Sequence, residues 1–145
     1  MKILLKDETP IARNPRRLAP KEAKIVDEQI LQWLKDGVIV PSNSEFASQV
    51  VVTWKKNGKP RVCIDYKSVN KVIVKEHFPI PFIEDLLDKL ADAKYFCLID
   101  LTDGFFHVGI SAESRKYTSF VTPNGQFEFT RVPFGLCNSP PVFQR

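Results

Sequence analysis

The feature that most constrains the fold is a β-hairpin pattern in the first half of the chain. Residues 50–54 are β-branched or aromatic, and residues 61–66 alternate between polar and apolar types. Between them, Asn57-Gly58 offers two residues that can take positive φ in a tight turn, so two antiparallel strands are predicted. Pro60 lacks an N–H to donate, so it is expected at a strand start or on a sheet edge. The tip, residues 55–59, is then a mobile basic loop.

Helices are predicted where apolar residues recur at helical spacing. Pro20 suits the first turn of a helix and Gly37 suits its end. A second, short helix is expected after the chain break at residues 79–81. The apolar residues expected on one face are Val26, Ile30, Trp33 and Leu34 in the first helix and Ile83, Leu86, Leu87 and Leu90 in the second.

Strands are predicted in the second half as well. Residues 95–99 form a continuous apolar run of strand length, which favours a central strand covered on both faces, and Asp100 ends it. Residues 117–122 and 126–131 suggest a second hairpin around Pro123-Asn124-Gly125. The fold class expected from these elements is α+β.

The chain ends soon after a predicted helix start. Ser139 is a good N-cap and Pro140 a good first helical residue, yet Arg145 follows less than two turns later. We therefore expect the sequence to be cut inside an element. No repeat, low-complexity segment or linker divides the chain, so one domain or part of one is predicted.

Composition narrows the class of protein. The 145 residues are 43% hydrophobic and 26% charged, which is ordinary globular usage. No apolar run reaches the ~18 residues of a membrane span, and the N-terminal apolar stretch is too short for a signal peptide. Cys63, Cys97 and Cys137 are odd in number and widely spaced, which fits neither a disulfide framework nor a zinc site and suggests a reducing compartment.

Charge is distributed unevenly. Residues 50–75 hold seven basic side chains against one acidic, a net +6, whereas residues 76–100 hold two basic against six acidic, a net −4. A polyanion site beside a cation site would give this pattern, but so would two solvated faces of one domain. Charge alone favours the second interpretation.

Several residues could carry chemistry. Asp100, at the end of a predicted buried strand, could ligate a hard cation such as Mg²⁺, or could simply cap the following turn. Gly104 would allow a ligand close to the backbone. Phe105 and Phe106 could stack on a base or sugar but are more often core residues, and His107 is more often a packed residue than a ligand. The three tip lysines and the nearby Arg61 form a candidate anion site for nucleic-acid phosphates or a nucleoside triphosphate, or else the tip is only a soluble loop. These cations are Lys55, Lys56, Lys59 and Arg61.

Taken together, these segments resemble the reverse transcriptase of gypsy-type long-terminal-repeat retrotransposons. The similar segments occur in family order over nearly the whole chain. They are residues 11–20, 34–42 with Ser44 and 46–48, the hairpin region 55–70, the run 95–101, and the Pro-Phe-Gly-Leu region 132–140. The resemblance implies the fingers and the start of the palm of a right-hand polymerase. By this mapping, residues of about 1–94 and 107–131 are fingers-like with a leading arm, and about 95–106 and 132–145 are palm-like.

The resemblance also implies roles for individual residues. Asp100 maps to the first metal-binding aspartate, and Leu101 to a residue whose carbonyl touches metal. Lys56 and Arg61 map to cations that grip the incoming triphosphate. The remaining nucleotide-binding residues are Asp103 and Gly104, whose backbone lies under the triphosphate, Phe105, the steric gate against a ribose 2′-hydroxyl, and Phe134, which supports nucleotide and template. His107 and Gly109 depart from the family pattern, which often has glutamine and a basic or polar residue there.

The implied activity is RNA-directed DNA polymerisation by two-metal nucleotidyl transfer, with Mg²⁺ or Mn²⁺ in the complete domain. Template-primer of RNA or DNA and deoxynucleoside triphosphates are the implied partners, in an intracellular setting: cytoplasmic virus-like particles or the nucleus. The family's second motif, an aromatic-x-Asp-Asp hairpin, is absent, as are the rest of the palm, the thumb and the ribonuclease H region. We therefore expect this chain alone not to extend a primer. The alternatives are a non-catalytic nucleic-acid-binding remnant of a truncated element and an inert product.

Overall fold

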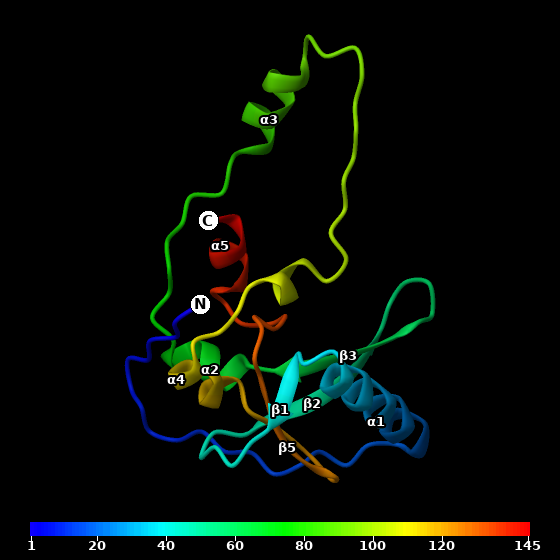
Figure 1. Ribbon diagram of the computed structural model, residues 1–145, viewed down its shortest axis with the longest axis vertical. Coiled ribbons are helices and arrows are strands. Elements are labelled where there is room, and N and C mark those ends of the chain that lie inside the picture. The colour runs from blue at the N-terminus through cyan, green and yellow to red at the C-terminus, as the bar shows by residue number, and fades with distance from the viewer.

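The computed structural model describes residues 1–145, and a five-stranded sheet organises most of them (Figure 1). The strand order is β1-β5-β4-β2-β3, with every neighbouring pair antiparallel except β2 and β4. The strands are β1 (Ile39–Pro41), β2 (Ser48–Trp54), β3 (Pro60–Asp65), β4 (Phe120–Thr122) and β5 (Gly125–Phe129). The sheet therefore joins the first 65 residues to residues 120–129, and the expected mixed α and β architecture is confirmed.

The first predicted hairpin is confirmed as β2 and β3, with Trp54 opposite Pro60 at the end of the ladder next to the turn. Pro60 is the first residue of its strand, as its missing N–H requires. The turn differs from the prediction at one residue, because only Gly58 has positive φ, +75°. The Gly58 N–H donates to the Lys55 carbonyl at 2.9 Å, and the Lys59 N–H donates to the Asn57 side chain. A longer loop with one left-handed residue relieves Asn57 of that conformation.

The second predicted hairpin is also confirmed, in shorter form. β4 and β5 pair antiparallel from Phe120↔Phe127 to Thr122↔Gly125. The residues just before β4 form a 3₁₀ turn, η2 (Lys116–Thr118), which follows the short helix α4 (Ala112–Arg115). The Thr118 hydroxyl accepts from the Phe129 N–H, so this turn is tied to the sheet.

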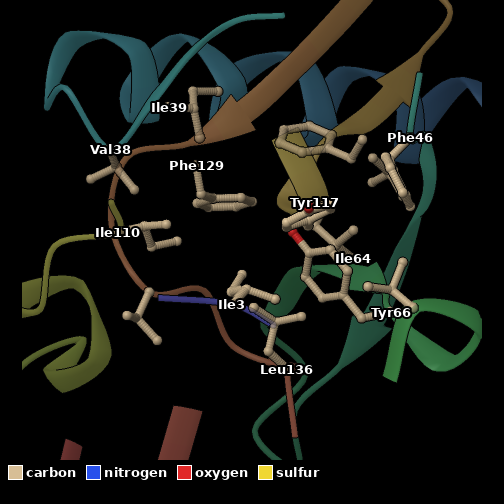
Figure 2. Packing of buried hydrophobic residues seen from close by; sticks show 14 of the residues in the cluster. Ile3, Val38, Ile39, Phe46, Ile64, Tyr66, Ile110, Tyr117, Phe129 and Leu136 are labelled. Atoms are coloured by element: carbon tan, nitrogen blue, oxygen red, sulfur yellow. The ribbon is translucent and has the colours of Figure 1, made fainter. Parts of the chain in front are cut away.

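Helix α1 (Pro20–Lys35) packs on the sheet and closes the core. Its predicted apolar stripe is confirmed: Val26 and Ile30 are buried, while Trp33 and Leu34 pack partly buried against the core. Trp33 meets the ring of Phe129 edge-on at 5.4 Å. Figure 2 shows Phe129 in this core together with Ile39 and Tyr117.

The other side of the core is closed by α2 (Lys67–Val72) and by the N-terminal segment. Ile3 and Tyr66 are both buried, and the Tyr66 hydroxyl donates to the Thr118 carbonyl at 2.8 Å. Burial raises the pKa of the Tyr66 hydroxyl well above its ordinary value of 10.0. Ile3, Tyr66 and Leu136, all labelled in Figure 2, belong to one buried cluster although they are far apart in sequence.

Residues 77–103, called the arm below, leave the body as an excursion (Figure 1). Every residue of the arm is exposed, including all of α3 (Ile83–Leu90). The helix forms where it was predicted, but its apolar face covers nothing. The predicted central strand at residues 95–99 is wrong: no strand forms there, and Tyr95 and Leu98 are 94% and 95% exposed. No strand of the chain offers this segment a hydrogen-bonding neighbour, so its β-forming residues have nothing to pair with.

Two short elements complete the chain, η1 (Gly104–His107) and α5 (Ser139–Gln144). Helix α5 starts one residue earlier than predicted, with Asn138 at the N-cap position. The Ser139 hydroxyl donates to the Pro133 carbonyl at 2.7 Å and so does not act as the cap. None of the helices combines the length and the apolar character needed to cross a membrane.

Candidate nucleotide-binding site

A cavity of about 360 Å³ opens where the arm rejoins the body. It brings together five of the predicted site residues, four from the continuous stretch 100–105 and one from the loop before α5. Its lining is Ile99, Asp100, Leu101, Gly104, Phe105, Phe134 and Phe143. The arm contributes Asp100 and Leu101, η1 contributes Gly104 and Phe105, and the loop before α5 contributes Phe134.

The turn at Asp103 sets the direction in which the chain enters the site. Asp103 has φ +50° and ψ +45°, a left-handed conformation that is uncommon for a residue with a side chain. The Phe106 N–H donates to the Asp103 carbonyl at 2.8 Å, which closes the turn. Asp and Asn tolerate this conformation better than most residues do, so an aspartate fits here. The backbone bend then carries Phe105 and Phe106 toward the core.

Gly104 allows the side chain of Phe143 to come close to the backbone. A Cβ at residue 104 would lie 3.0 Å from the nearest atom of the Phe143 ring. Phe143 in turn meets Phe105 edge-on, with ring centroids 5.5 Å apart and planes at 73°. Helix α5 therefore forms the back wall of the cavity.

Phe134 lies at the centre of the site. Its ring centroid is 4.8 Å from that of Phe105 and 5.6 Å from that of Phe106. The Arg61 guanidinium carbon lies 4.8 Å from the Phe134 centroid, a cation–π contact. Phe105 and Arg61, which are far apart in the sequence, are thus both fixed relative to one ring.

Phe134 also lines a second cavity of about 370 Å³, on the hairpin side. That cavity includes Lys55, Arg61 and Asp103 together with Trp33 of α1. Lys56 lines neither cavity and is exposed at the hairpin tip. None of the cations of the tip forms an ion pair, since both ion pairs of the chain lie elsewhere, Lys2–Glu113 and Arg145–Glu76.

The donor atoms beside Asp100 are few. Asp100 and Asp103 are both exposed, and no group of three or more His, Cys, Asp or Glu side chains is close enough to hold a metal ion. The oxygen donors that Asp100 and the Leu101 carbonyl offer are of the kind that a hard divalent cation prefers. They are two donors, fewer than the ~6 oxygen ligands that such a cation takes.

Sequence reasoning missed two features of this site. Phe143 was not singled out, although its place on a helix directly after the Pro-Phe-Gly-Leu region, with apolar Val142, could have suggested a packing role. Lys55 was grouped with the other tip cations, and only the fold shows that it lines a cavity with Arg61. The half-buried state of Phe105 and Phe106 agrees with their interpretation as core-packed rings.

Comparison with known proteins identifies the family. The family model described as reverse transcriptase (RNA-dependent DNA polymerase) matches residues 53–145. The chain belongs to the reverse transcriptase family. The matched residues include the hairpin cations and all the aromatic residues that line the Asp100 cavity.

Two relatives from Drosophila melanogaster are retrovirus-related Pol polyproteins. That of transposon 412 is 38% identical over 97% of this chain, and that of transposon gypsy is 36% identical over 83% of it. The chain spans only 12% of the length of either relative. The resemblance to gypsy-type elements is confirmed.

Solved structures show the same fold. The protease–reverse transcriptase of prototype foamy virus superposes with a TM-score of 0.86 at 31% identity, over 98% of this chain and 19% of the viral chain. A foamy viral protease–reverse transcriptase in complex with double-stranded DNA superposes with a TM-score of 0.79 at 26% identity, over 99% and 24% of the two chains. The predicted polymerase fold is confirmed, and the chain corresponds to part of a reverse transcriptase domain.

Proposed function

We propose that this chain forms the nucleotide-binding part of an RNA-directed DNA polymerase. The observation that carries the proposal is the single cavity in which Asp100, Phe105 and Phe134 meet, with the Arg61 guanidinium against Phe134. A carboxylate for a metal, an aromatic wall for a sugar and a cation for a phosphate are the groups that nucleotidyl transfer needs in one place.

The proposal also divides the chain between two subdomains. Residues of about 1–94 and 107–131 would be the fingers and leading arm, and about 95–106 and 132–145 the start of the palm. The hairpin β2–β3 and the sheet lie in the first group, while Asp100 and the Pro-Phe-Gly-Leu turn lie in the second. The cavity that holds Asp100 is lined by the second group alone, and the adjoining cavity that holds Arg61 is lined by both groups.

A divalent metal ion, Mg²⁺ or Mn²⁺, would be held by the Asp100 carboxylate and the Leu101 carbonyl together with ligands from elsewhere in the polymerase. Bound there, it would supply charge neutralisation and activation of the primer 3′-hydroxyl. Because Asp100 and Leu101 are a partial set, this chain by itself is not expected to extend a primer.

The chain's own residues would hold the nucleotide. Arg61 and Lys56 would contact the triphosphate, with Arg61 aimed by its contact with Phe134. Phe105 is wedged between Phe134 and Phe143, so its ring has little freedom to move aside for a ribose 2′-hydroxyl. The backbone at Asp103 and Gly104 would lie beneath the phosphates.

The macromolecular partner would be an RNA or DNA template-primer. Support comes from the foamy viral enzyme, 26% identical, whose structure holds double-stranded DNA. Deoxynucleoside triphosphates would be the small-molecule substrates.

The test uses a polymerase domain completed with the palm and thumb of a related transposon. Asp100→Asn should abolish DNA synthesis, because it keeps the side-chain size but removes the charge that a hard cation requires. Template-primer affinity and thermal unfolding should stay unchanged. Asp92→Asn, an exposed aspartate of the arm, is the matched control and should retain full activity. Persistent synthesis by Asp100→Asn would contradict the proposed role.

Phe105→Ala separates sugar selection from metal binding in the same domain. It should keep synthesis and incorporate ribonucleotides, because the ring no longer fills the space beside C2′. Phe82→Ala, which removes an exposed ring from the arm outside the palm-like residues, is the control. An unchanged preference for deoxyribonucleotides would mean that Phe105 only supports packing.

A second candidate, nucleic-acid binding without catalysis, is favoured by the three tip lysines and Arg61 of β3, none of which forms an ion pair. The chain should then bind single-stranded nucleic acid weakly and without sequence preference. With ~3 phosphates neutralised, log affinity should fall against log salt with a slope of about −2. Replacing Lys55, Lys56, Lys59 and Arg61 by alanine should flatten that slope, and an unchanged slope would place binding elsewhere.

A further inference from the structure

We infer that Asn70 is a positioning residue for the nucleotide pocket, because its amide fixes the turn that carries Phe134. The inference rests on the proposed function. Asn70 lies on α2 and lines neither of the two cavities that form the site. It touches no predicted substrate group, so any effect on the reaction must pass through the turn.

Both polar atoms of the Asn70 side-chain amide form hydrogen bonds. Its Nδ2 donates to the Gly135 carbonyl at 2.8 Å, and its Oδ1 accepts from the Cys137 N–H at 2.9 Å. The two bonds bracket Leu136, which is 2% exposed. One side chain therefore clasps the backbone on both sides of a buried residue.

The turn needs such a clasp because its conformation is special. Gly135 has φ +95°, and a Cβ there would lie 3.4 Å from the Ile64 carbonyl of β3. No strand pairs with residues 133–137, so the turn lacks ladder hydrogen bonds. The amide of Asn70 is its link to α2, while Asn138 holds a different segment by bonds to Val74 and Glu76.

The position of the turn sets the position of the pocket. Phe134 directly precedes Gly135 and carries the contacts to Arg61 and Phe105, each at 4.8 Å. If Gly135 moved, the Phe134 ring would move with it. Arg61, proposed to bind phosphate, and Phe105, proposed to face the sugar, would then no longer be positioned by the same ring.

Asn70→Asp tests the clasp with almost no change in size. The aspartate can still accept from the Cys137 N–H, but its other oxygen faces the Gly135 carbonyl and cannot donate to it. Asn70→Ala removes both bonds without repulsion and is the milder second variant. Asn43→Asp makes the same charge change on an exposed loop where the side chain has no hydrogen bond, so it is the matched control.

The first measurement uses this chain alone and needs no catalysis. In a Cys63→Ser, Cys97→Ser background, Cys137 is the one thiol left, half-buried beside the clasp. Asn70→Asp and Asn70→Ala should each raise the rate of Cys137 alkylation by iodoacetamide about tenfold, with an unchanged far-ultraviolet circular dichroism spectrum. The Asn43→Asp rate should equal the parent rate. Parent-like alkylation in both Asn70 variants would overturn the clasp.

The second measurement uses the completed polymerase domain. Both Asn70 variants should raise KM for deoxynucleoside triphosphates about tenfold, with kcat changed less than threefold and template-primer affinity unchanged. A purely structural loss would lower the active fraction, and hence the apparent kcat, but leave KM alone. A parent-like KM would therefore overturn the positioning role. If the parent domain makes no DNA, the proposed function fails, while the alkylation result still decides the clasp.

Discussion

The body of the chain and its arm contain similar sequence patterns with different structural outcomes. In the body, residues 50–54 lie in β2 and pair with β3, and the start of the same strand, Ser48 and Gln49, also pairs with β4. In the arm, the apolar residues 95–99 form no strand and stay exposed. A strand needs backbone partners as well as suitable side chains, and only the body supplies them.

The two longest helices teach the same lesson. α1 and α3 both carry an apolar stripe on a polar background, and both form where the stripe predicts. α1 buries Val26 and Ile30, whereas α3 buries nothing. Helical spacing therefore predicts the element, but packing depends on what the rest of the fold places opposite it.

Charge divides along the same boundary. The arm has six acidic and two basic side chains, a net charge of −4. Because the whole chain has a net charge of +4, the rest of it carries +8. The cavity that holds Asp100 and the adjoining cavity that holds Arg61 lie where the acidic arm meets the basic body. Opposite charges at that junction suit a site that takes both a cation and a triphosphate.

The largest expected effect is the difference in stability between two Phe→Ala variants, one in the body and one in the arm. Phe129→Ala, in a residue 1% exposed, should lower the free energy of unfolding by about 3–5 kcal/mol, because it leaves a cavity in the core. Phe96→Ala, in a residue 69% exposed, should change it by less than about 0.5 kcal/mol. Urea denaturation of both variants measures the difference. Comparable losses would mean that the arm is packed.

Amide hydrogen exchange should also differ strongly between the arm and the body. An isolated helix of eight residues is marginal in water, so α3 amides should exchange nearly as fast as unstructured ones. The amides of β2 and β3 should exchange at least ~100-fold more slowly, because opening them disrupts the core. Hydrogen exchange read by mass spectrometry of peptides measures both at once. Strong protection of α3 would erase the distinction between arm and body.

How much the sequence could predict follows from the same contrast. Local signals sufficed for α1, for both hairpins and for the position of Pro60, since each depends on residues close in the chain. The strand at residues 95–99 failed because an apolar run does not say whether a neighbour exists. The positive φ at Asp103 also escaped prediction, since aspartate tolerates a left-handed backbone but does not require one.

The candidate site was predicted in part. Family resemblance located Asp100, Phe105 and Phe134, and the fold brings all three to one cavity. Periodicity could not locate Phe143 or the Asn70 clasp, because both depend on contacts between segments distant in the chain. Whether Lys56 contacts a nucleotide stays a prediction, since the tip that carries it is exposed.

Buried Tyr66 gives the body a pH dependence that the arm cannot share. Burial raises the pKa of the Tyr66 hydroxyl above the ordinary 10.0. The contribution of the neutral hydroxyl to the free energy of unfolding is therefore fully present below pH ~10, and it is lost as the pH rises from there toward the folded-state pKa. The unfolding free energy of the parent chain should thus fall above pH ~10. Tyr66→Phe should remove this hydroxyl's contribution to the fall, at a cost of about 1 kcal/mol near neutral pH from the lost bond to Thr118. Chemical denaturation across this pH range measures both effects, and an identical alkaline fall in the variant would contradict the assignment to Tyr66.

The smallest expected effect lies at the junction itself, where Gly104 faces the Phe143 ring. Gly104→Ala places a Cβ 3.0 Å from that ring, which must shift by a few tenths of an ångström. The ring can give way because Phe143 is 39% exposed near the end of α5, and alanine also reduces the entropy of the unfolded chain. We therefore expect a net change within about 1 kcal/mol.

A double-mutant cycle isolates the contact at this junction. Phe143→Leu removes the opposing ring, so Gly104→Ala should be more favourable in that background by about 0.5 kcal/mol or more. Amide exchange of α3 should stay the same in all three variants, because the contact joins η1 to α5 within the body. Additive effects of the two substitutions would show that Gly104 and Phe143 do not touch. Altered α3 exchange would instead show that the arm senses the packing of the body across this glycine, and the two regions would then form one cooperative unit.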